Sequence, residues 1–172
     1  MTAFNNASAS FSGARHDHRR CVTGALANAA GICARRRVRL TDLRRRVLEL
    51  VWDSHAPVGA YDILGRLATE QGRAAPPTVY RALEFLLDHG LIHRIESLNA
   101  YVGCVHPDGA HGGQFLICGG CGAAAEVHDP QVEAAIARRA ADLGFAVRRK
   151  TVEVEGLCPP CQQRREEGAD AG

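Results

Sequence analysis

Residues 76–104 read "PPTVYRALEFLLDHGLIHRIESLNAYVGC". The two prolines suit the first turn of a helix, apolar residues then recur at helical spacing, and Gly90 suits the C-terminal cap. Two short apolar segments follow on either side of the turn "SLN". The stretch therefore predicts a helix followed by a two-stranded hairpin.

Two more helices are predicted upstream of this stretch. In "TDLRRRVLELVWDSHAP" Thr41 is suited to cap a helix with an apolar stripe, and "GAYDILGRLATEQG" carries a second stripe that stops at Gly72. Three helices with short joints are typical of a helix-turn-helix, and the hairpin would be its wing. We therefore expect a winged-helix domain over residues 21–104, with a hinge near residues 96–109. Residues 1–20 are expected to be a disordered extension.

The pattern changes after Gly109. "GQFLIC" and "AAAEVH" predict two strands, Asp129-Pro130 opens a helix that closes at Gly144, and "FAVRRKTVEVEG" alternates as a half-buried strand should. The fold class is therefore α+β, with a small α/β (ββαβ) domain over residues 110–161 and a disordered tail over residues 162–172. A domain of this size needs a dimer partner or a metal staple.

The charge distribution along the chain and the expected cellular compartment restrict the classes of function that the protein can have. Residues 1–95 hold 14 Arg and 8 acidic residues, whereas residues 96–172 carry a net charge of −4. A basic half joined to an acidic half is compatible with a nucleic-acid-binding module on a separate scaffold, and also with ordinary solvated surface. No run approaches a membrane span, and the N-terminus has no apolar core of a secretory signal. We expect a cytoplasmic protein, in which seven cysteines favour metal or redox chemistry over disulfides.

Two CxxC pairs are the strongest chemical signal. Each CxxC turn brings two thiolates within reach of one metal, and two turns complete a tetrahedral S₄ site. The ββαβ order accounts for the long separation, because it returns the second pair beside the first. A thioredoxin-like redox pair and unrelated surface cysteines are the alternatives. The predicted structural zinc ligands are Cys118, Cys121, Cys158 and Cys161.

A second ligand set remains beside these cysteines. Cys104 closes the second hairpin strand, His93 lies on the strand that pairs with it, His111 precedes the first CxxC, and Glu126 follows it. A site of two nitrogens, one sulfur and one oxygen suits Zn²⁺ and disfavours Mg²⁺ and Mn²⁺, while Fe²⁺ and Co²⁺ are not excluded by ligand type. The nearby His106 and His128 have no assigned role.

These segments together resemble the ferric uptake regulator (Fur) family. The residues that carry the resemblance are "PPTVYRALEFLLDHGLIHRIESLNAYVGC", "HGGQFLICGGCGAAAE" and "LCPPC", within roughly residues 33–161. Within the family the chain is most similar to the zinc uptake regulators. The resemblance implies a winged-helix domain, a dimerisation domain, a structural zinc on the two CxxC pairs and a regulatory zinc on His93, Cys104, His111 and Glu126. Two zinc ions per chain are expected.

DNA contacts follow from the winged-helix expectation. The N-terminal residues of the third helix should meet base edges in the major groove, which assigns Thr78, Tyr80 and Arg81. Arg81 can pair with guanine, whereas Tyr80 can contact DNA or simply pack. Tyr61 resembles a family DNA contact. The chain departs from the family's usual Thr-Pro-Gln-Arg at Thr41-Asp42-Leu43-Arg44.

The expected function is a zinc-responsive repressor that binds palindromic operator DNA as a homodimer and controls zinc uptake genes. An iron- or peroxide-responsive regulator of the same family is the first alternative, although the His-His-Asp-His run of iron sensors is absent from this sequence. A zinc-dependent hydrolytic enzyme is disfavoured, because the sequence contains neither HExxH nor His-x-Glu. No catalytic residue, membrane partner or small-molecule substrate other than the metal is expected.

Overall fold

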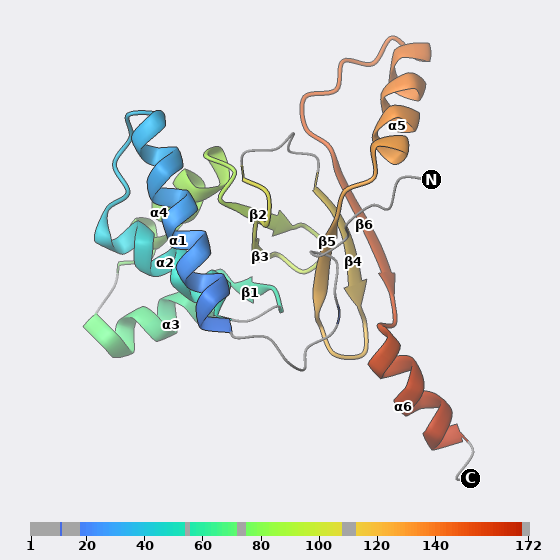
Figure 1. The fold of residues 1–172 in the computed structure, drawn as a ribbon, viewed down its shortest axis with the longest axis horizontal. Helices are drawn as coiled ribbons and strands as arrows, with labels where there is room; N and C mark the ends of the chain where they lie inside the picture. The colour runs from blue at the N-terminus through green and yellow to red at the C-terminus, as the bar shows by residue number, and fades with distance from the viewer. Residues whose placement is uncertain (1–10, 12–17, 54–55, 72–74, 108–112, 170–172) are drawn as a thin grey trace. The chain divides into compact units, whose positions relative to one another are not determined.

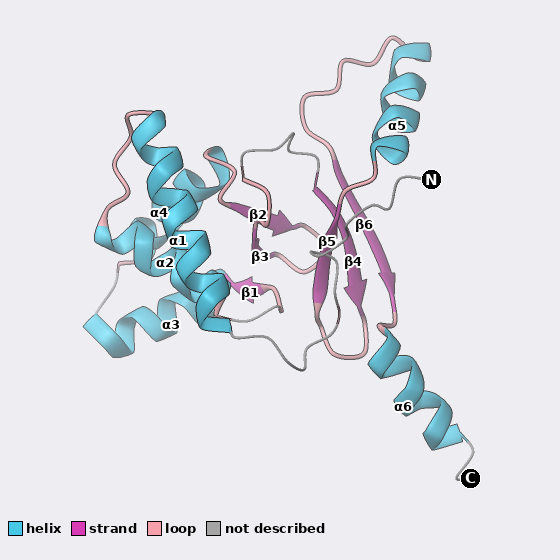
Figure 2. Ribbon diagram, viewed as in Figure 1, coloured by secondary structure: helices cyan, strands magenta, loops and turns pink. Residues whose placement is uncertain are grey.

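The computed structural model describes residues 11, 18–53, 56–71, 75–107 and 113–169 (Figure 1). The chain divides into two compact units. We call residues 12–109 the N-terminal unit, and residues 1–11 together with 110–172 the C-terminal unit. The predicted mixture of helix and sheet is confirmed, as Figure 2 shows.

The N-terminal unit contains the three predicted helices and the hairpin, and a further helix that begins at His18, inside the segment expected to be disordered. Its elements in chain order are α1 (His18–Arg35), α2 (Asp42–Trp52), β1 (Val58–Gly59), α3 (Ala60–Gln71), α4 (Pro76–Asp88), β2 (Ile92–Ile95) and β3 (Ala100–Gly103). The strands form an antiparallel sheet in the order β1-β3-β2. The two-residue β1, which pairs Val58 with Tyr101, was not predicted from the sequence.

Local chemistry fixes the ends of these elements. The Thr41 side chain accepts a hydrogen bond from the backbone N–H of Arg44 at 3.4 Å, which confirms the predicted N-cap of α2. Gly90 follows α4 with a φ of 66°, a conformation that glycine adopts without steric cost. Asn99 takes a φ of 47° in the turn between β2 and β3.

The core of the N-terminal unit is apolar and continuous. It joins the inner faces of α1 to α4 with the sheet, and its largest fully buried side chains include Ile32, Leu48, Ile63, Leu83 and Ile92. Helix α2 packs against α1, α3 and α4 and also against β3. Because α2 contacts both α4 and β3, it connects α4 to the strand that leads to Cys104.

The C-terminal unit has the predicted ββαβ order. Its elements are β4 (Gly113–Cys118), β5 (Ala124–Val127), α5 (Pro130–Asp142), β6 (Thr151–Gly156) and α6 (Pro159–Ala169). Strand β4 lies in the middle of the sheet, antiparallel to β5 and parallel to β6. The Asp129 side chain caps α5, with Pro130 at its first position, as predicted. The disordered tail expected from residue 162 is contradicted, because α6 occupies most of that segment.

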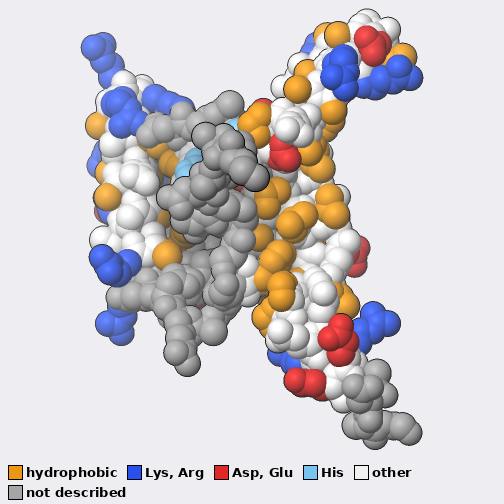
Figure 3. All heavy atoms as spheres, turned by 45° about the vertical axis from the view of Figure 1, so that its right-hand side comes forward, with side chains coloured by type: hydrophobic (Ala, Val, Ile, Leu, Met, Phe, Trp, Pro, Cys, Tyr) orange, Lys and Arg blue, Asp and Glu red, His pale blue; other side chains and the backbone are white. Residues whose placement is uncertain are grey.

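The surface of the C-terminal unit carries unburied apolar side chains. Helix α5 has no buried residue, and Leu143 and Phe145 beyond it are each 69% exposed. Hydrophobic side chains are visible at the surface of the molecule in Figure 3. None of the helices in the described ranges combines the length and apolar character that a membrane crossing requires.

Candidate metal centre and nucleic-acid interface

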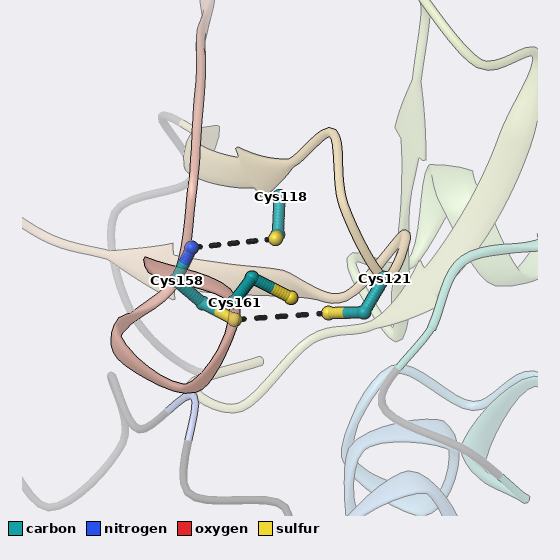
Figure 4. Close-up of side chains that lie close together, drawn as sticks. All are labelled: Cys118, Cys121, Cys158 and Cys161. Atoms are coloured by element: carbon teal, nitrogen blue, oxygen red, sulfur yellow. Dashed lines mark hydrogen bonds between the residues drawn. The ribbon is translucent and has the colours of Figure 1, made fainter. Parts of the chain in front are cut away.

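Sheet topology gathers the four CxxC cysteines. Cys118 ends β4, Cys121 lies in the turn before β5, Cys158 follows β6, and Cys161 lies in the first turn of α6 (Figure 4). The parallel register sets Cys118 opposite Gly156, so the chain returns to the first CxxC as it leaves β6. One sulfur from each cysteine lies within 4.8 Å of the others.

The spacing and burial of these sulfurs fit a tetrahedral metal. A Zn–S distance of about 2.3 Å gives a sulfur–sulfur edge of about 3.8 Å in a tetrahedron. The sulfurs of Cys121 and Cys158 are 3.7 Å apart. Cys118, Cys158 and Cys161 are buried, whereas Cys121 is exposed. The donor set is all sulfur, which is the chemistry of closed structural zinc sites.

Backbone hydrogen bonding prepares the Cys118 thiolate. The backbone N–H of Cys158 donates to the Cys118 sulfur at 3.3 Å (Figure 4). This hydrogen bond is the main reason that the pKa of Cys118 falls to about 6. Burial acts in the opposite direction on its neighbour and raises the pKa of Cys158. The hydrogen bond from Cys158 therefore favours the thiolate form of Cys118.

Groups around the cysteines support the cluster. Nη2 of Arg164 donates to the Cys161 sulfur at 2.8 Å, and Phe11 and Leu157 pack against the buried sulfurs. A Cβ on Gly120 would come within 3.1 Å of the Cys161 sulfur, so a side chain there would press against this sulfur. Sequence reasoning missed Arg164, because the segment after Cys161 was expected to be disordered.

The predicted regulatory ligands occupy both units. In the N-terminal unit, His93 on β2 pairs with Val102 on β3, and Cys104 follows two residues later. Since side chains alternate along strands, His93 and Cys104 belong to the same face of the hairpin. The backbone N–H of Cys104 donates to the carbonyl oxygen of Leu91 at 3.1 Å. In the C-terminal unit, Glu126 lies on β5, and His111 is outside the described residues.

The predicted DNA-contacting side chains lie at the starts of two helices. Tyr61 is 81% exposed in the first turn of α3, and Thr78, Tyr80 and Arg81 are all exposed in the first turns of α4. The intervening Val79 is fully buried, so α4 packs by one face and leaves the other open. Tyr80 is 39% exposed, so part of its side chain is open to solvent.

Some of the arginines in and before α2 are exposed, whereas others are held by contacts within the protein. Arg35, Arg36, Arg37, Arg39 and Arg45 are exposed. Arg46 is instead held by Glu49 and by a two-point ion pair with Glu70. Arg44 stacks over the Phe85 ring at 3.6 Å. The exposed arginines are therefore the ones whose side chains are open to an anionic partner.

Two further residues with metal-binding side chains, His128 and Cys33, lie outside the two predicted ligand sets. His128 is exposed, with Nδ1 4.0 Å from a carboxylate oxygen of Glu133, which also pairs with Lys150 at 3.1 Å. Cys33 is buried in the helical core, and that burial raises the pKa of its thiol. Within the part of the chain that the structure describes, neither residue belongs to a group of potential metal ligands.

Comparison with known proteins gives consistent matches. The family model of the ferric uptake regulator family matches residues 35–155. The "Zinc uptake regulation protein" of Escherichia coli (strain K12) is 44% identical over 137 residues, covering 79% of this chain and 80% of that protein. A zinc uptake regulator complexed with zinc and DNA has a TM-score of 0.81 at 42% identity, covering 84% of this chain and 97% of that one. The crystal structure of holo XcZur has a TM-score of 0.75 at 42% identity, and the match covers 80% of this chain and 96% of that one.

Proposed function

Because the chain belongs to the ferric uptake regulator family, we propose that it is a zinc-responsive transcriptional repressor. It binds palindromic operator DNA as a homodimer in the cytoplasm when zinc fills a regulatory site, and it controls zinc uptake genes. The observation that carries the proposal is the similarity over 84% of the chain to a zinc uptake regulator complexed with zinc and DNA.

The four CxxC cysteines would hold a structural zinc. The 3.7 Å separation of the Cys121 and Cys158 sulfurs supports this assignment, since it matches a tetrahedral edge. The cluster joins the end of β4 to the start of α6, so a metal here supplies a cross-link between segments far apart in the chain. Its role is to stabilise the C-terminal unit rather than to respond to zinc.

The regulatory zinc ligands would be His93, Cys104, His111 and Glu126. This donor set favours zinc, because the thiolate disfavours hard cations such as Mg²⁺. His93 and Cys104 are presented by paired strands of the wing, whereas His111 and Glu126 follow in the C-terminal unit. Ligands drawn from both units would make the spacing of two winged helices in a dimer depend on zinc.

The exposed side chains at the start of α4 would read the operator. Helix-turn-helix proteins place these positions at base edges in the major groove, and dimers require a fixed half-site spacing. Zinc needs to favour the DNA-competent arrangement by only about 1–3 kcal/mol to act as a switch. Tyr61 and the exposed arginines near α2 would contact phosphates.

An operator-binding titration under anaerobic conditions tests the metal response. Zn²⁺, Fe²⁺ and Mn²⁺ are each buffered at defined free concentrations, and the metal content per chain is measured on the same samples. We expect tight DNA binding only with zinc and two zinc ions per chain. Activation by Fe²⁺ at a comparable free concentration would overturn the zinc assignment in favour of an iron-responsive member of the family.

Two cysteine variants separate the two sites. Cys104→Ser is expected to lose one zinc per chain, to stay folded, and to lose zinc-dependent DNA binding. Cys118→Ser is expected to lose the structural metal and to impair folding or dimerisation. If Cys104→Ser retained both its full metal content and its operator affinity, the regulatory site would be misassigned.

A further inference from the structure

Trp52 packs directly against the backbone of Gly103. A Cβ placed on Gly103 would lie 2.7 Å from Cδ2 of the indole and closer still to Cε2 and Nε1. Non-bonded carbon atoms favour separations of about 3.5–4.0 Å. Gly103 is buried, and its φ is outside the left-handed range, so a larger residue would have to displace the indole or the strand end, without strain from the backbone conformation itself.

This contact lies immediately next to a proposed zinc ligand. Gly103 ends β3 and precedes Cys104. Because strand side chains alternate, the indole supports the face of β3 opposite to the one shared by His93 and Cys104. Trp52 and Cys104 also line the same surface hollow of about 230 Å³ in the N-terminal unit.

Trp52 also connects this strand to the DNA-binding helices. It is the last residue of α2, and α2 packs against both α4 and β3. The Nε1 atom of Trp52 is buried with no hydrogen-bond partner among the described residues. The indole therefore contributes through its ring, which packs against the helical core as well as against Gly103.

We propose that Trp52 is a positioning residue for the regulatory ligand Cys104. Its ring fixes the end of β3 against α2, and so holds the Cys104 thiolate at the place where zinc binds while joining that strand to α4. This inference rests on the proposed function, because it takes Cys104 to be a zinc ligand. It assigns a role to a side chain that is not itself a ligand.

A double-mutant cycle tests the contact. Gly103→Ala should weaken zinc binding at the regulatory site about tenfold, because the added methyl group displaces either the ring or the strand end. In the Trp52→Leu background the same Gly103→Ala change should alter zinc affinity by less than about twofold, since the ring no longer fills the space. Trp52→Leu alone should weaken zinc binding. Equal effects of Gly103→Ala in both backgrounds would overturn the proposal.

Matched controls separate positioning from general stability. Gly65→Ala on α3 adds the same methyl group where no atom lies within 4 Å, and it should leave zinc affinity unchanged. Trp52→Phe keeps an aromatic ring and removes the unpartnered N–H, so its zinc affinity should stay within about threefold of wild type. Should Gly103→Ala fail to fold, the comparison of Trp52→Leu with Trp52→Phe still decides the question.

The readouts distinguish this proposal from the proposed function. Trp52 is the only tryptophan of the chain, so its fluorescence reports zinc binding beside Cys104 without any DNA. The second zinc equivalent should change the emission of the wild type and leave that of Cys104→Ser unchanged. If Gly103→Ala lowered the unfolding temperature but kept wild-type zinc affinity, Trp52 would be merely structural and the proposed function would stand. Loss of the zinc response in DNA binding by the wild type would instead remove the proposed function.

Discussion

Arg164 donates a hydrogen bond from Nη2 to the sulfur of Cys161 at 2.8 Å. The contact is charge-assisted, and the Cys161 sulfur is the main reason that the pKa of Arg164 is raised. A zinc ion with four thiolates carries a net negative charge, which a neighbouring guanidinium offsets. Arg164 thus belongs to the outer shell of the proposed structural zinc site.

Arg164→Gln should accelerate zinc transfer from the four-cysteine site to a chelator by about tenfold, because outer-shell partners affect metal affinity by that order. The rate is followed by the absorbance of a chromophoric chelator, and the proposed regulatory zinc ligands are left unchanged in every variant. Arg165→Gln, a change at the exposed neighbour on the same helix, is the matched control. Identical transfer rates in the two variants would show that the guanidinium does not support the site.

The sequence predicted those features whose causes are local. Caps and turn residues such as Thr41, Gly90 and Asp129 act within a few positions, and their effects appear in the structure where they were expected. The returning order of β4, α5 and β6 also followed from periodicity. The clustering of the four CxxC sulfurs is a consequence of that order and of the parallel register between β4 and β6.

Features that depend on tertiary contacts could not be predicted in this way. Strand β1 is only two residues long and exists through its pairing with β3, so it has no periodic signal. Helix α6 lacks an apolar face, and it is attached at its start by Cys161 and by a hydrogen bond from Gln162 to Leu157. The contact of Trp52 with Gly103 joins residues about fifty positions apart, and no sequence pattern links them.

The exposed apolar residues after α5 lead to a prediction about assembly. Phe145→Glu should shift the proposed homodimer towards monomer, because a carboxylate would replace an apolar side chain that is 69% exposed and would be buried on association. Sedimentation velocity over a range of protein concentrations measures the shift. Leu98→Glu, in the exposed turn between β2 and β3, is the control and should remain dimeric. An unchanged dimer in Phe145→Glu would remove this residue from the interface.

His89 gives the N-terminal unit a pH dependence. Burial, assisted by the nearby positive charge of Arg36, lowers the pKa of His89 below its ordinary value of 6.5. The unfolded chain therefore takes up a proton at a higher pH than the folded chain does. The fold incurs no penalty from His89 well above pH 6.5, and it loses stability as the pH falls through 6.5 towards the lowered pKa.

Thermal unfolding at several pH values tests this sign. The unfolding temperature of the wild type should fall more steeply below pH 6.5 than that of His89→Gln, which cannot be protonated. Comparing the two proteins under the same zinc buffer cancels acid-induced changes that both share. Parallel pH profiles would mean that His89 titrates alike in the folded and unfolded chains.

Arg81 offers the sharpest test of the DNA interface. Its side chain is exposed near the start of α4, whereas Val79 beside it is buried, so truncating Arg81 leaves the packing of the helix intact. Arg81→Met should weaken operator binding by about 5- to 150-fold, the range of one specific base contact, with an unchanged zinc content per chain. Arg139→Met on α5 of the C-terminal unit is the matched control and should bind as the wild type does.

Binding to the operator and to unrelated DNA separates two roles for Arg81. A base contact predicts a larger loss for the operator than for unrelated DNA, whereas a phosphate contact predicts equal losses and a salt dependence reduced by about one unit of slope. The exposure of Arg81 beside Thr78 and Tyr80 at the start of α4 favours the base contact, since this end of a recognition helix meets base edges. Wild-type affinity of Arg81→Met for the operator would move the recognition surface away from α4.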